Sequence, residues 1–362
     1  MSDTAHMAHA LALGRRGLGR VWPNPAVGCV IVRDGRIVGR GWTAPGGRPH
    51  AEVRALAQAG HQAQGATAYV TLEPCSHHGK TPPCADALVA AGIGRVVVAH
   101  PDPDPRVNGQ GISRLRSAGI DVVTGVLEDR ARQDLQGFLS RVEANRPMVT
   151  LKLASSLDGR IATGTGESQW ITGPMARRTV HALRATHDAV LVGAGTARAD
   201  DPSLTVRDLG IDHQPVRVVI SRRLDLPKGK LFQTARAVPV WLVHGDDAPT
   251  QTQTDWKDAG AELVPCELSD ARHLDLRHVL KALAERGLTR VFCEGGGALA
   301  GSLIDAGCVD HLITMTAGVA LGAEGRPSLS AMGIDRLDHA PRFALRDTCD
   351  LGGDVMSRWV PA

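Results

Sequence analysis

The sequence predicts an α/β protein of two domains, each built from strands that alternate with helices. Its 362 residues are enough for about two domains. Strand-like apolar runs alternate with helical patterns in both halves of the chain. Between the halves, a charge-mixed helical segment from Glu128 to Asn145 is followed by Arg146-Pro147, where the alternation starts again. We therefore expect domains at residues 1–145 and 146–362.

The first half has the pattern of a three-layer α/β sandwich. Residues 1–17 have helical spacing and no basic stretch ahead of an apolar core, which predicts a helix and not a signal peptide. Asp34-Gly35 is a hairpin signal between two strands, and Gly60 predicts a helix end. The expected strands are residues 26–32, 36–42, 66–73, 95–100 and 121–125, and the further expected helices are residues 50–60, 84–92 and 111–119.

The second half repeats the alternation without an internal sequence repeat. It opens on the run MVTLKLASSLDGRIA at residues 148–162, and after residue 323 it becomes rich in turn residues. The expected helices are residues 174–187, 276–287 and 298–307, and the expected strands are residues 188–193, 216–221, 238–244, 290–295, 309–316, 343–348 and 355–360.

The composition favours a small-molecule substrate. Lysine and arginine number 41 against 38 acidic residues, a net charge of +3, and there is no long basic run, which argues against nucleic acid or a membrane as partner. Aromatic residues make up only 3% of the chain, too few for base-stacking platforms. Seven scattered cysteines are a poor disulfide framework. No apolar run approaches eighteen residues, so we expect a cytoplasmic enzyme.

The stretch LEPCSHHGKTPPC, from Leu72 to Cys84, combines cysteines and histidines in a short space. A phosphate loop is excluded because Pro74 stands where the loop needs its first glycine. A thioredoxin-type redox pair is excluded because eight residues separate Cys75 from Cys84, and that chemistry needs two. A metal site remains.

Upstream residues complete a catalytic zinc pattern. His50-Ala51-Glu52 opens a helix, and Pro74-Cys75 ends the next strand, as in zinc deaminases, although the spacing of two between the cysteines is stretched to eight here. One imidazole and two thiolates leave a fourth zinc position for water, and helix N-termini lower thiol pKa values. Glu52, which is not a ligand, would shuttle protons. The alternative is a structural zinc site made of Cys75, Cys84, Cys29 and either His77 or His78.

The second half carries an incomplete dinucleotide pattern. Gly193-Ala194-Gly195 follows a strand, but Arg198 stands where a third small residue belongs. The turn Gly295-Gly296-Gly297 after Glu294 follows a strand and opens a helix, so its amides suit a pyrophosphate, although such a turn is as often a packing feature.

Four arginines of this half are candidate phosphate contacts. Arg222 and Arg223 follow a strand and either bind the 2′-phosphate of NADP or are ordinary surface residues. Arg184 and Arg207 either bind a substrate phosphate in bidentate fashion or are solvated charges.

Taken together, the strings PNPAVGCVIV, HAEVRAL, TLEPCSHHGKTPPC, SSLDGRIA and DDPSLT resemble, in order and spacing, the bifunctional deaminase–reductase family of riboflavin biosynthesis. The resemblance covers nearly the whole chain. It implies a cytidine-deaminase-like α/β/α sandwich followed by a dihydrofolate-reductase-like α/β domain. Trp22 and Asp104 depart from the family's usual residues, which bears on substrate contacts in the first domain and not on the metal.

The resemblance also implies a role for each matching residue. In the first domain, His50, Cys75 and Cys84 would hold zinc, Glu52 would be catalytic, and Asn24 would contact the pyrimidine. In the second domain it implies NADPH contacts from Ala154, Trp170, Thr196, Asp200, Ser221, Gly296 and Gly297, and substrate contacts from Ser168, Arg184, Leu204, Arg207 and Glu294. Lys152 lies in the same region, with its role left open.

The implied chemistry has two steps on a phosphorylated pyrimidine. Hydrolysis removes the C2 amino group of a diaminopyrimidinone, and NADPH then delivers hydride to C1′ of the ring-opened ribose. We expect a homo-oligomer, a dimer or tetramer through the reductase domain. Two rivals remain: a deaminase of free nucleosides or tRNA with a non-catalytic second domain, and a zinc-stabilised regulatory protein that senses a nucleotide.

Overall fold

The computed structural model describes residues 2–77, 82–268 and 273–362. The chain divides into two compact units, Met1–Asn145 and Arg146–Ala362, which are described separately.

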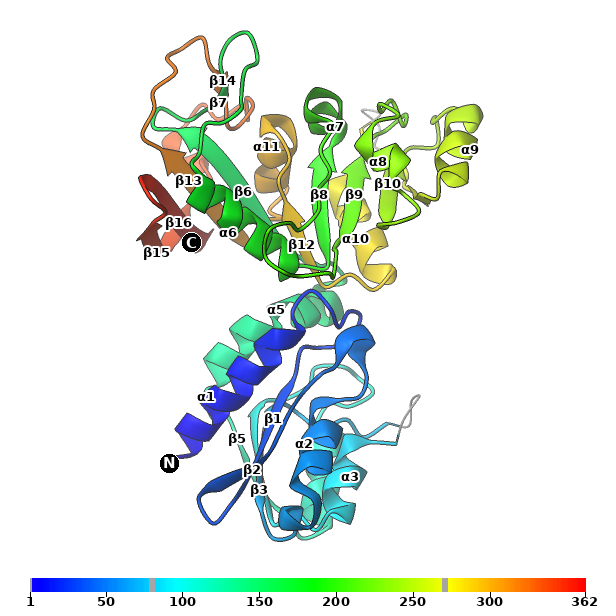
Figure 1. The fold of residues 1–362 in the computed structure, drawn as a ribbon, viewed down its shortest axis with the longest axis vertical. Helices are drawn as coiled ribbons and strands as arrows, with labels where there is room; N and C mark the ends of the chain where they lie inside the picture. Colours follow the sequence, from blue (N-terminus) through cyan, green and yellow to red (C-terminus); the bar gives the residue numbers. More distant parts are fainter. Residues whose placement is uncertain (1, 78–81, 269–272) are drawn as a thin grey trace. The chain divides into compact units, whose positions relative to one another are not determined.

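The first unit is a five-stranded sheet covered by helices on both faces (Figure 1). The strand order is β2-β1-β3-β4-β5; β1 is antiparallel to β2 and β3, whereas β3, β4 and β5 are parallel. Helices α1 and α5 lie on one face, and α2, α3 and α4 on the other. The strands are β1 (Gly28–Arg33), β2 (Arg36–Trp42), β3 (Thr67–Leu72), β4 (Arg95–His100) and β5 (Asp121–Thr124), and the helices are α1 (Asp3–Gly14), α2 (Ala51–Ala59), α3 (Cys84–Ala90), α4 (Gln110–Ser117) and α5 (Glu128–Ala144). The predicted three-layer sandwich is confirmed.

The second unit is a nine-stranded sheet in the order β11-β10-β9-β8-β12-β6-β13-β16-β15. The strands from β11 to β13 are parallel, and β16 and β15 add an antiparallel edge. Its strands are β6 (Met148–Ser156), β8 (Ala189–Gly193), β9 (Val216–Ile220), β10 (Val240–His244), β11 (Glu262–Pro265), β12 (Arg290–Cys293), β13 (His311–Ala317), β15 (Phe343–Asp350) and β16 (Asp354–Pro361), and a separate pair joins β7 (Arg160–Ala162) to β14 (Arg326–Pro327).

Helices cover both faces of this larger sheet. Figure 1 shows α6 crossing one face, with α10 and α11 on the opposite one. The helices are α6 (Pro174–Ala185), α7 (Ala194–Asp200), α8 (Lys230–Gln233), α9 (Thr250–Asp258), α10 (Leu276–Glu285) and α11 (Gly297–Asp305).

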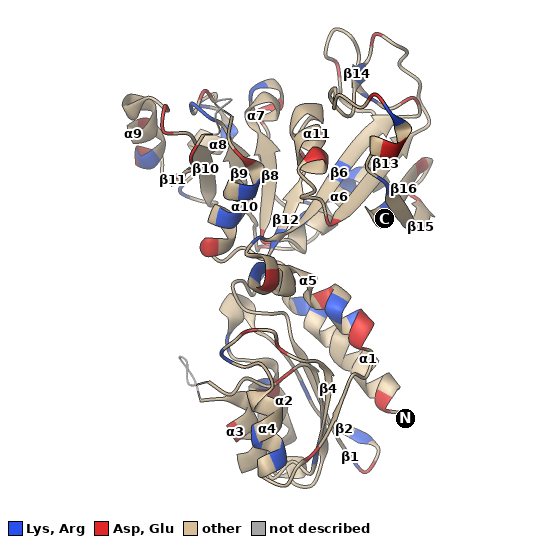
Figure 2. Ribbon diagram, turned by 180° about the vertical axis from the view of Figure 1, so that it is seen from behind, with Lys and Arg blue, Asp and Glu red and all other residues tan. Residues whose placement is uncertain are grey.

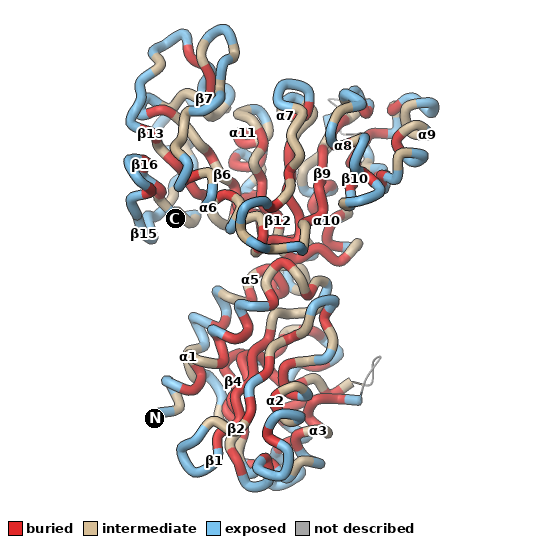
Figure 3. The backbone as a smooth tube through the Cα atoms, in the orientation of Figure 1, coloured by how far each residue is buried: buried red, intermediate tan, exposed pale blue. Residues whose placement is uncertain are grey.

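Each unit has its own core, formed by its central strands (Figure 3). Strands β4 and β8 are buried almost from end to end, as expected for parallel strands covered on both faces. Strand β15, by contrast, is exposed along nearly its whole length at the sheet edge.

The sequence missed several elements of the second unit. The run 148–162 is two strands, β6 and β7, separated by a turn. Helix α9 has the mostly polar sequence TQTQTDWKD and buries only Trp256, so it lacks a clear apolar period.

Among the described helices, none is both long and apolar enough to cross a membrane. Figure 2 shows acidic and basic residues interspersed over both units.

Candidate functional site

The predicted metal ligands of the first unit meet at the end of β3. His50 directly precedes α2, Cys75 follows β3, and Cys84 is the first residue of α3. His50 Nδ1 lies 3.3 Å from Cys84 Sγ and 3.7 Å from Cys75 Sγ, and the three ligand atoms all lie within 4.8 Å of one another. The N-terminus of α3 also supports Cys75, because the backbone N–H of Cys84 donates to Cys75 Sγ over 3.3 Å.

The donor set fits zinc. Hydrogen bonding from Cys84 lowers the pKa of the Cys75 thiol to about 4, whereas the same contact with Cys75, together with burial, raises the pKa of Cys84. A bound cation would remove the remaining thiol proton, since a coordinating thiol is deprotonated outright. Two thiolates and one imidazole are a three-ligand zinc set that leaves a position for water.

Glu52 lies beside this cluster without belonging to it. It is the second residue of α2, two residues after His50, and its side chain is buried. Burial first, and then the nearby Cys75 sulfur, raise the pKa of Glu52 to about 7. A carboxyl group whose pKa lies near neutrality can both accept and donate a proton at that pH.

Asn24, Cys29 and His77 are the other described candidates of the first unit, and none of them belongs to the ligand group. Asn24 packs against Gly47, where an added Cβ would lie 1.7 Å from the Asn24 Nδ2 atom, and Gly47 is three residues before His50. Cys29 is fully buried in β1, and the His77 Nδ1 atom is buried without a partner; neither joins the ligand group among the described residues. His78 and Lys80 lie outside the described residues.

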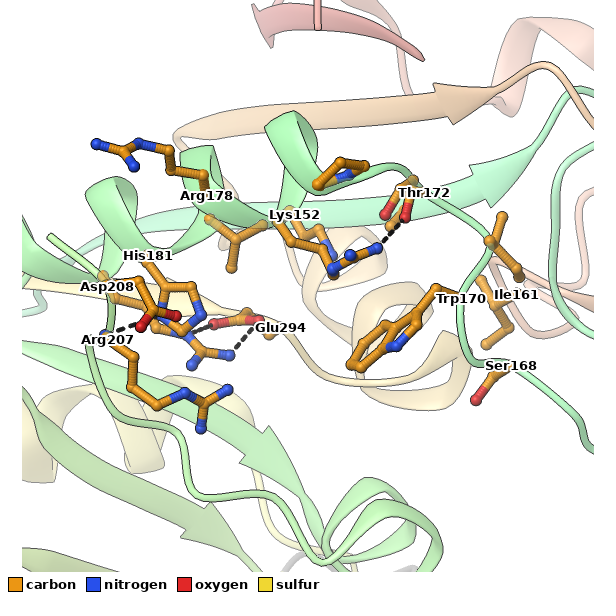
Figure 4. Close-up of a pocket in the computed structure, with 16 residues that line it drawn as sticks. Lys152, Ile161, Ser168, Trp170, Thr172, Arg178, His181, Arg207, Asp208 and Glu294 are labelled. Carbon is orange, nitrogen blue, oxygen red and sulfur yellow. Dashed lines mark hydrogen bonds and ion pairs between the residues drawn. The ribbon is translucent and has the colours of Figure 1, made fainter. Parts of the chain in front are cut away.

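The second unit has a cavity of about 580 Å³ where most of the predicted substrate contacts meet. Ser168, Arg184, Arg207 and Glu294 line it, together with Ala154 and Trp170 from the predicted cofactor set and Lys152. Figure 4 shows His181, Arg207 and Glu294 gathered at one end, with Trp170 and Ser168 towards the other.

Arg184 and Arg207 differ in whether their guanidinium groups are already paired with other residues of the protein. Arg184 forms a two-point ion pair with Glu294, at 2.5 Å from Nε to Oε1 and 3.0 Å from Nη2 to Oε2, and its Nη1 donates to the Thr205 carbonyl. The guanidinium of Arg207 is exposed, and no hydrogen bond or ion pair of that group is found among the described residues. From the sequence, both arginines are equally good candidates for a phosphate contact. In the structure, only Arg207 has a guanidinium group without a partner among the described residues.

Lys152 and Glu294 lie at the junction with a second cavity of about 430 Å³. Burial lowers the pKa of Lys152, whereas Arg184 and Lys152 hold the pKa of Glu294 below its ordinary value against the effect of burial. The predicted cofactor residues Thr196, Asp200, Gly296 and Gly297 line this second cavity, and Ala154 and Ser168 are shared with the first.

The glycine turn is tightly packed against its neighbours. Gly296 is the N-cap of α11, and its backbone N–H donates to Thr196 Oγ1 over 3.0 Å. A Cβ on Gly297 would lie 3.1 Å from the Pro327 carbonyl oxygen. The turn is therefore closely packed and also lines the second cavity, whereas its binding of a dinucleotide stays a prediction.

Ser221, Arg222 and Arg223 line a third cavity, of about 520 Å³, beside the end of β9. Arg222 is held in an ion pair by Asp247, whereas Arg223 has no hydrogen bond or ion pair among the described residues. Leu204 does not line any of these three cavities and is buried in the core, so its predicted substrate contact stays a prediction.

Two lining residues escaped the sequence analysis. Arg177 and His181 lie on α6, seven and three residues before Arg184, so all three lie on one helix face and border the first cavity. The Arg177 guanidinium stacks on the Trp170 ring, 4.8 Å from its centroid. Their spacing from Arg184 could have identified them, because residues three and seven positions apart lie on the same face of a helix.

Comparisons with known proteins agree with this geometry. Residues 1–100 match the family model of the cytidine and deoxycytidylate deaminase zinc-binding region, and residues 147–357 match that of the RibD C-terminal domain. The riboflavin biosynthesis protein RibD of Escherichia coli K12 is 44% identical over 369 residues, which cover 100% of both chains. That of Bacillus amyloliquefaciens is 41% identical and covers 98% of this chain and 95% of its own.

Solved structures of related proteins are also similar to this chain over nearly its whole length. Acinetobacter baumannii RibD superposes with a TM-score of 0.90 at 41% identity, and 99% of each chain is covered. A diaminohydroxyphosphoribosylaminopyrimidine deaminase/5-amino-6-(5-phosphoribosylamino)uracil reductase from Thermotoga maritima superposes with a TM-score of 0.87 at 35% identity, again over 99% of each chain.

Proposed function

The chain belongs to the RibD family of bifunctional deaminase–reductases of riboflavin biosynthesis, and on that premise we propose how its residues divide the two reactions. Its first unit has the cytidine-deaminase fold and its second the dihydrofolate-reductase-like fold. Residues 1–145 carry hydrolytic deamination of 2,5-diamino-6-ribosylamino-4(3H)-pyrimidinone 5′-phosphate. Residues 146–362 carry NADPH-dependent reduction of the ribosyl chain of 5-amino-6-(5-phosphoribosylamino)uracil to the ribityl form.

In the first unit, His50, Cys75 and Cys84 would hold zinc, which supplies a Lewis acid that lowers the pKa of water. The Glu52 carboxylate takes up the proton of the attacking water and returns protons to the ring nitrogen and the departing amine. Asn24, packed beside the segment that leads to His50, is placed to hold the pyrimidine. The buried Glu52 next to the three ligands is the observation that carries this assignment.

In the second unit, NADPH supplies the hydride. The amides of the glycine turn would bind its pyrophosphate, and Trp170, Thr196 and Asp200 would border it. Arg207 would bind the 5′-phosphate of the substrate, so that remote binding energy aligns C1′. Arg184 would act mainly by holding Glu294 at the junction of the two cavities.

The experiment for the deaminase half compares Glu52→Gln with the wild-type protein. The variant keeps the size of the side chain and all three metal ligands, so we expect unchanged zinc content and a loss of ammonia release of about 100-fold or more. NADPH consumption with the aminouracil substrate should stay at the wild-type rate and serves as the control. Ammonia release at the wild-type rate with zinc retained would show that Glu52 has another role.

We also propose that the chain forms a homo-oligomer through its reductase unit. Strand β15 is an exposed edge of the large sheet, and such an edge presents unpaired backbone groups to a partner strand. Sedimentation of the intact chain tests this, and a monomer at micromolar concentration would contradict it.

A further inference from the structure

The metal-binding cysteines of the first unit are braced from outside by helix α4. This helix carries none of the three zinc ligands, yet contacts from it and from the loop before it reach the residues on either side of Cys75 and the helix that begins at Cys84. The inference rests on the zinc site described above and concerns the residues that keep its ligands in place.

The first contact is made by Glu73, two residues before Cys75. Its side chain is only 3% exposed, and each of its carboxylate oxygens accepts two backbone N–H groups. Oε1 accepts from Gly111 at 2.9 Å and Ile112 at 3.1 Å, in the first turn of α4. Oε2 accepts from Asp102 at 3.2 Å and Gly109 at 3.0 Å, in the preceding loop. A carboxylate with four such donors is firmly fixed, and it also neutralises the positive end of the helix.

The helix approaches the ligand strand as closely as the backbone permits. A Cβ built on Gly111 would lie 2.0 Å from the Pro74 carbonyl oxygen, well inside van der Waals contact. Only glycine therefore fits at this position of α4 without moving the peptide that joins Pro74 to Cys75.

The second contact is made by Arg114, one turn further along α4. Its Nη1 donates to the Ser76 carbonyl over 3.2 Å and to the Asp86 carboxylate over 3.0 Å. Ser76 follows Cys75 directly, and Asp86 lies two residues after Cys84 in α3. One guanidinium group thus ties together the two chain segments that carry the sulfur ligands.

We propose that Glu73 and Arg114 are positioning residues for the zinc site, which act through α4 to hold Cys75 and Cys84 at ligand spacing before the metal arrives. Eight residues separate the two cysteines, so chain connectivity alone does not fix their distance. Groups that orient metal ligands commonly contribute 10- to 100-fold to metal affinity. Within the described residues, neither side chain has a hydrogen bond to a ligand atom of the zinc site.

The test measures zinc affinity of the full-length chain by competition with a chelator. We expect Arg114→Met to raise the zinc dissociation constant about tenfold or more, and Glu73→Gln to do the same, because its amide would face two of the N–H donors that the carboxylate now accepts. Arg114→Lys, which keeps one donor and the charge, should recover part of the affinity. The matched control is Arg116→Met on the same helix, whose side chain is exposed and, within the described part of the chain, donates only to the Val122 carbonyl at 3.4 Å; this variant should bind zinc like the wild type.

A second readout separates positioning from general stability. With Co²⁺ in place of zinc, the absorption bands report ligand geometry, and we expect them to shift in Arg114→Met and not in Arg116→Met. If Arg114→Met binds zinc as tightly as the wild type, or if Arg116→Met weakens binding equally, the proposal is wrong, whatever the folding of Glu73→Gln. Failure of the wild-type chain to bind zinc would instead contradict the metal site itself.

Discussion

At the scale of single residues, arginines with the same predicted role differ in whether their guanidinium groups are already paired. Arg184 is occupied by Glu294 and the Thr205 carbonyl, whereas the guanidinium of Arg207 faces the cavity region without a partner among the described residues. A charged side chain already held by a buried carboxylate gives little to a ligand, since its donors are in use. The same contrast divides Arg222, paired with Asp247, from Arg223.

Arg207→Ala should therefore act on substrate binding. We expect the KM for the phosphorylated aminouracil to rise about tenfold or more, because one charge-assisted contact contributes roughly 1.5–3 kcal/mol. The control is Arg178→Ala, which removes the same charge from a side chain that Figure 4 shows pointing away from Glu294 and Trp170. Steady-state kinetics measure both, and an unchanged KM in Arg207→Ala would remove its phosphate role.

Arg223→Ala should reduce the preference for NADPH over NADH. If Arg223 meets the 2′-phosphate, its loss raises the KM for NADPH roughly 10- to 100-fold and leaves that for NADH nearly unchanged, since NADH lacks the phosphate. Arg222→Ala is the matched neighbour, and its partner Asp247 predicts a much smaller effect. Equal effects of the two substitutions on the NADPH/NADH ratio would contradict this assignment.

At the scale of elements, the helix that begins directly after His50 and carries Glu52 is positioned by two glycines of the strand beneath it. A Cβ on Gly41 would lie 2.0 Å from the Ala51 carbonyl oxygen, and one on Gly39 would lie 2.2 Å from that of Ala55. Helix α2 therefore rests directly on the backbone of β2, which fixes the position of the helix that carries Glu52.

Sequence patterns predicted the elements with strong periodicity and the residues with distinctive chemistry. The strands of both units were predicted where apolar runs are uninterrupted, and His50, Glu52 and Cys75 were predicted because zinc chemistry demands their residue types. The pairing of Arg184 with Glu294, 110 residues apart, could not be predicted, because no local pattern records a long-range contact. The same holds for the four N–H groups around Glu73.

At the scale of the whole molecule, each unit has its own hydrophobic core, so we expect each ligand to stabilise only the unit that binds it. The main core of the first unit extends from Met7 to Leu139, and two hydrophobic clusters of the second unit, among the described residues, contain only residues beyond Arg146. A ligand that binds one native unit stabilises that unit by mass action and leaves the other unaffected. The two bound groups of this enzyme belong to different units, so each is a probe of one of them.

We therefore expect two unfolding transitions in calorimetry of the intact chain. Removing zinc with a chelator should lower only one, since the ligand cluster lies wholly in the first unit. NADPH at a hundred times its dissociation constant should raise only the other, by about 2.7 kcal/mol or roughly 5–10 °C for a unit of this size. Adding both treatments to one sample should move the transitions in opposite directions. A single transition that responds to both treatments would show that the units unfold together, because the folding of one core would then depend on the other.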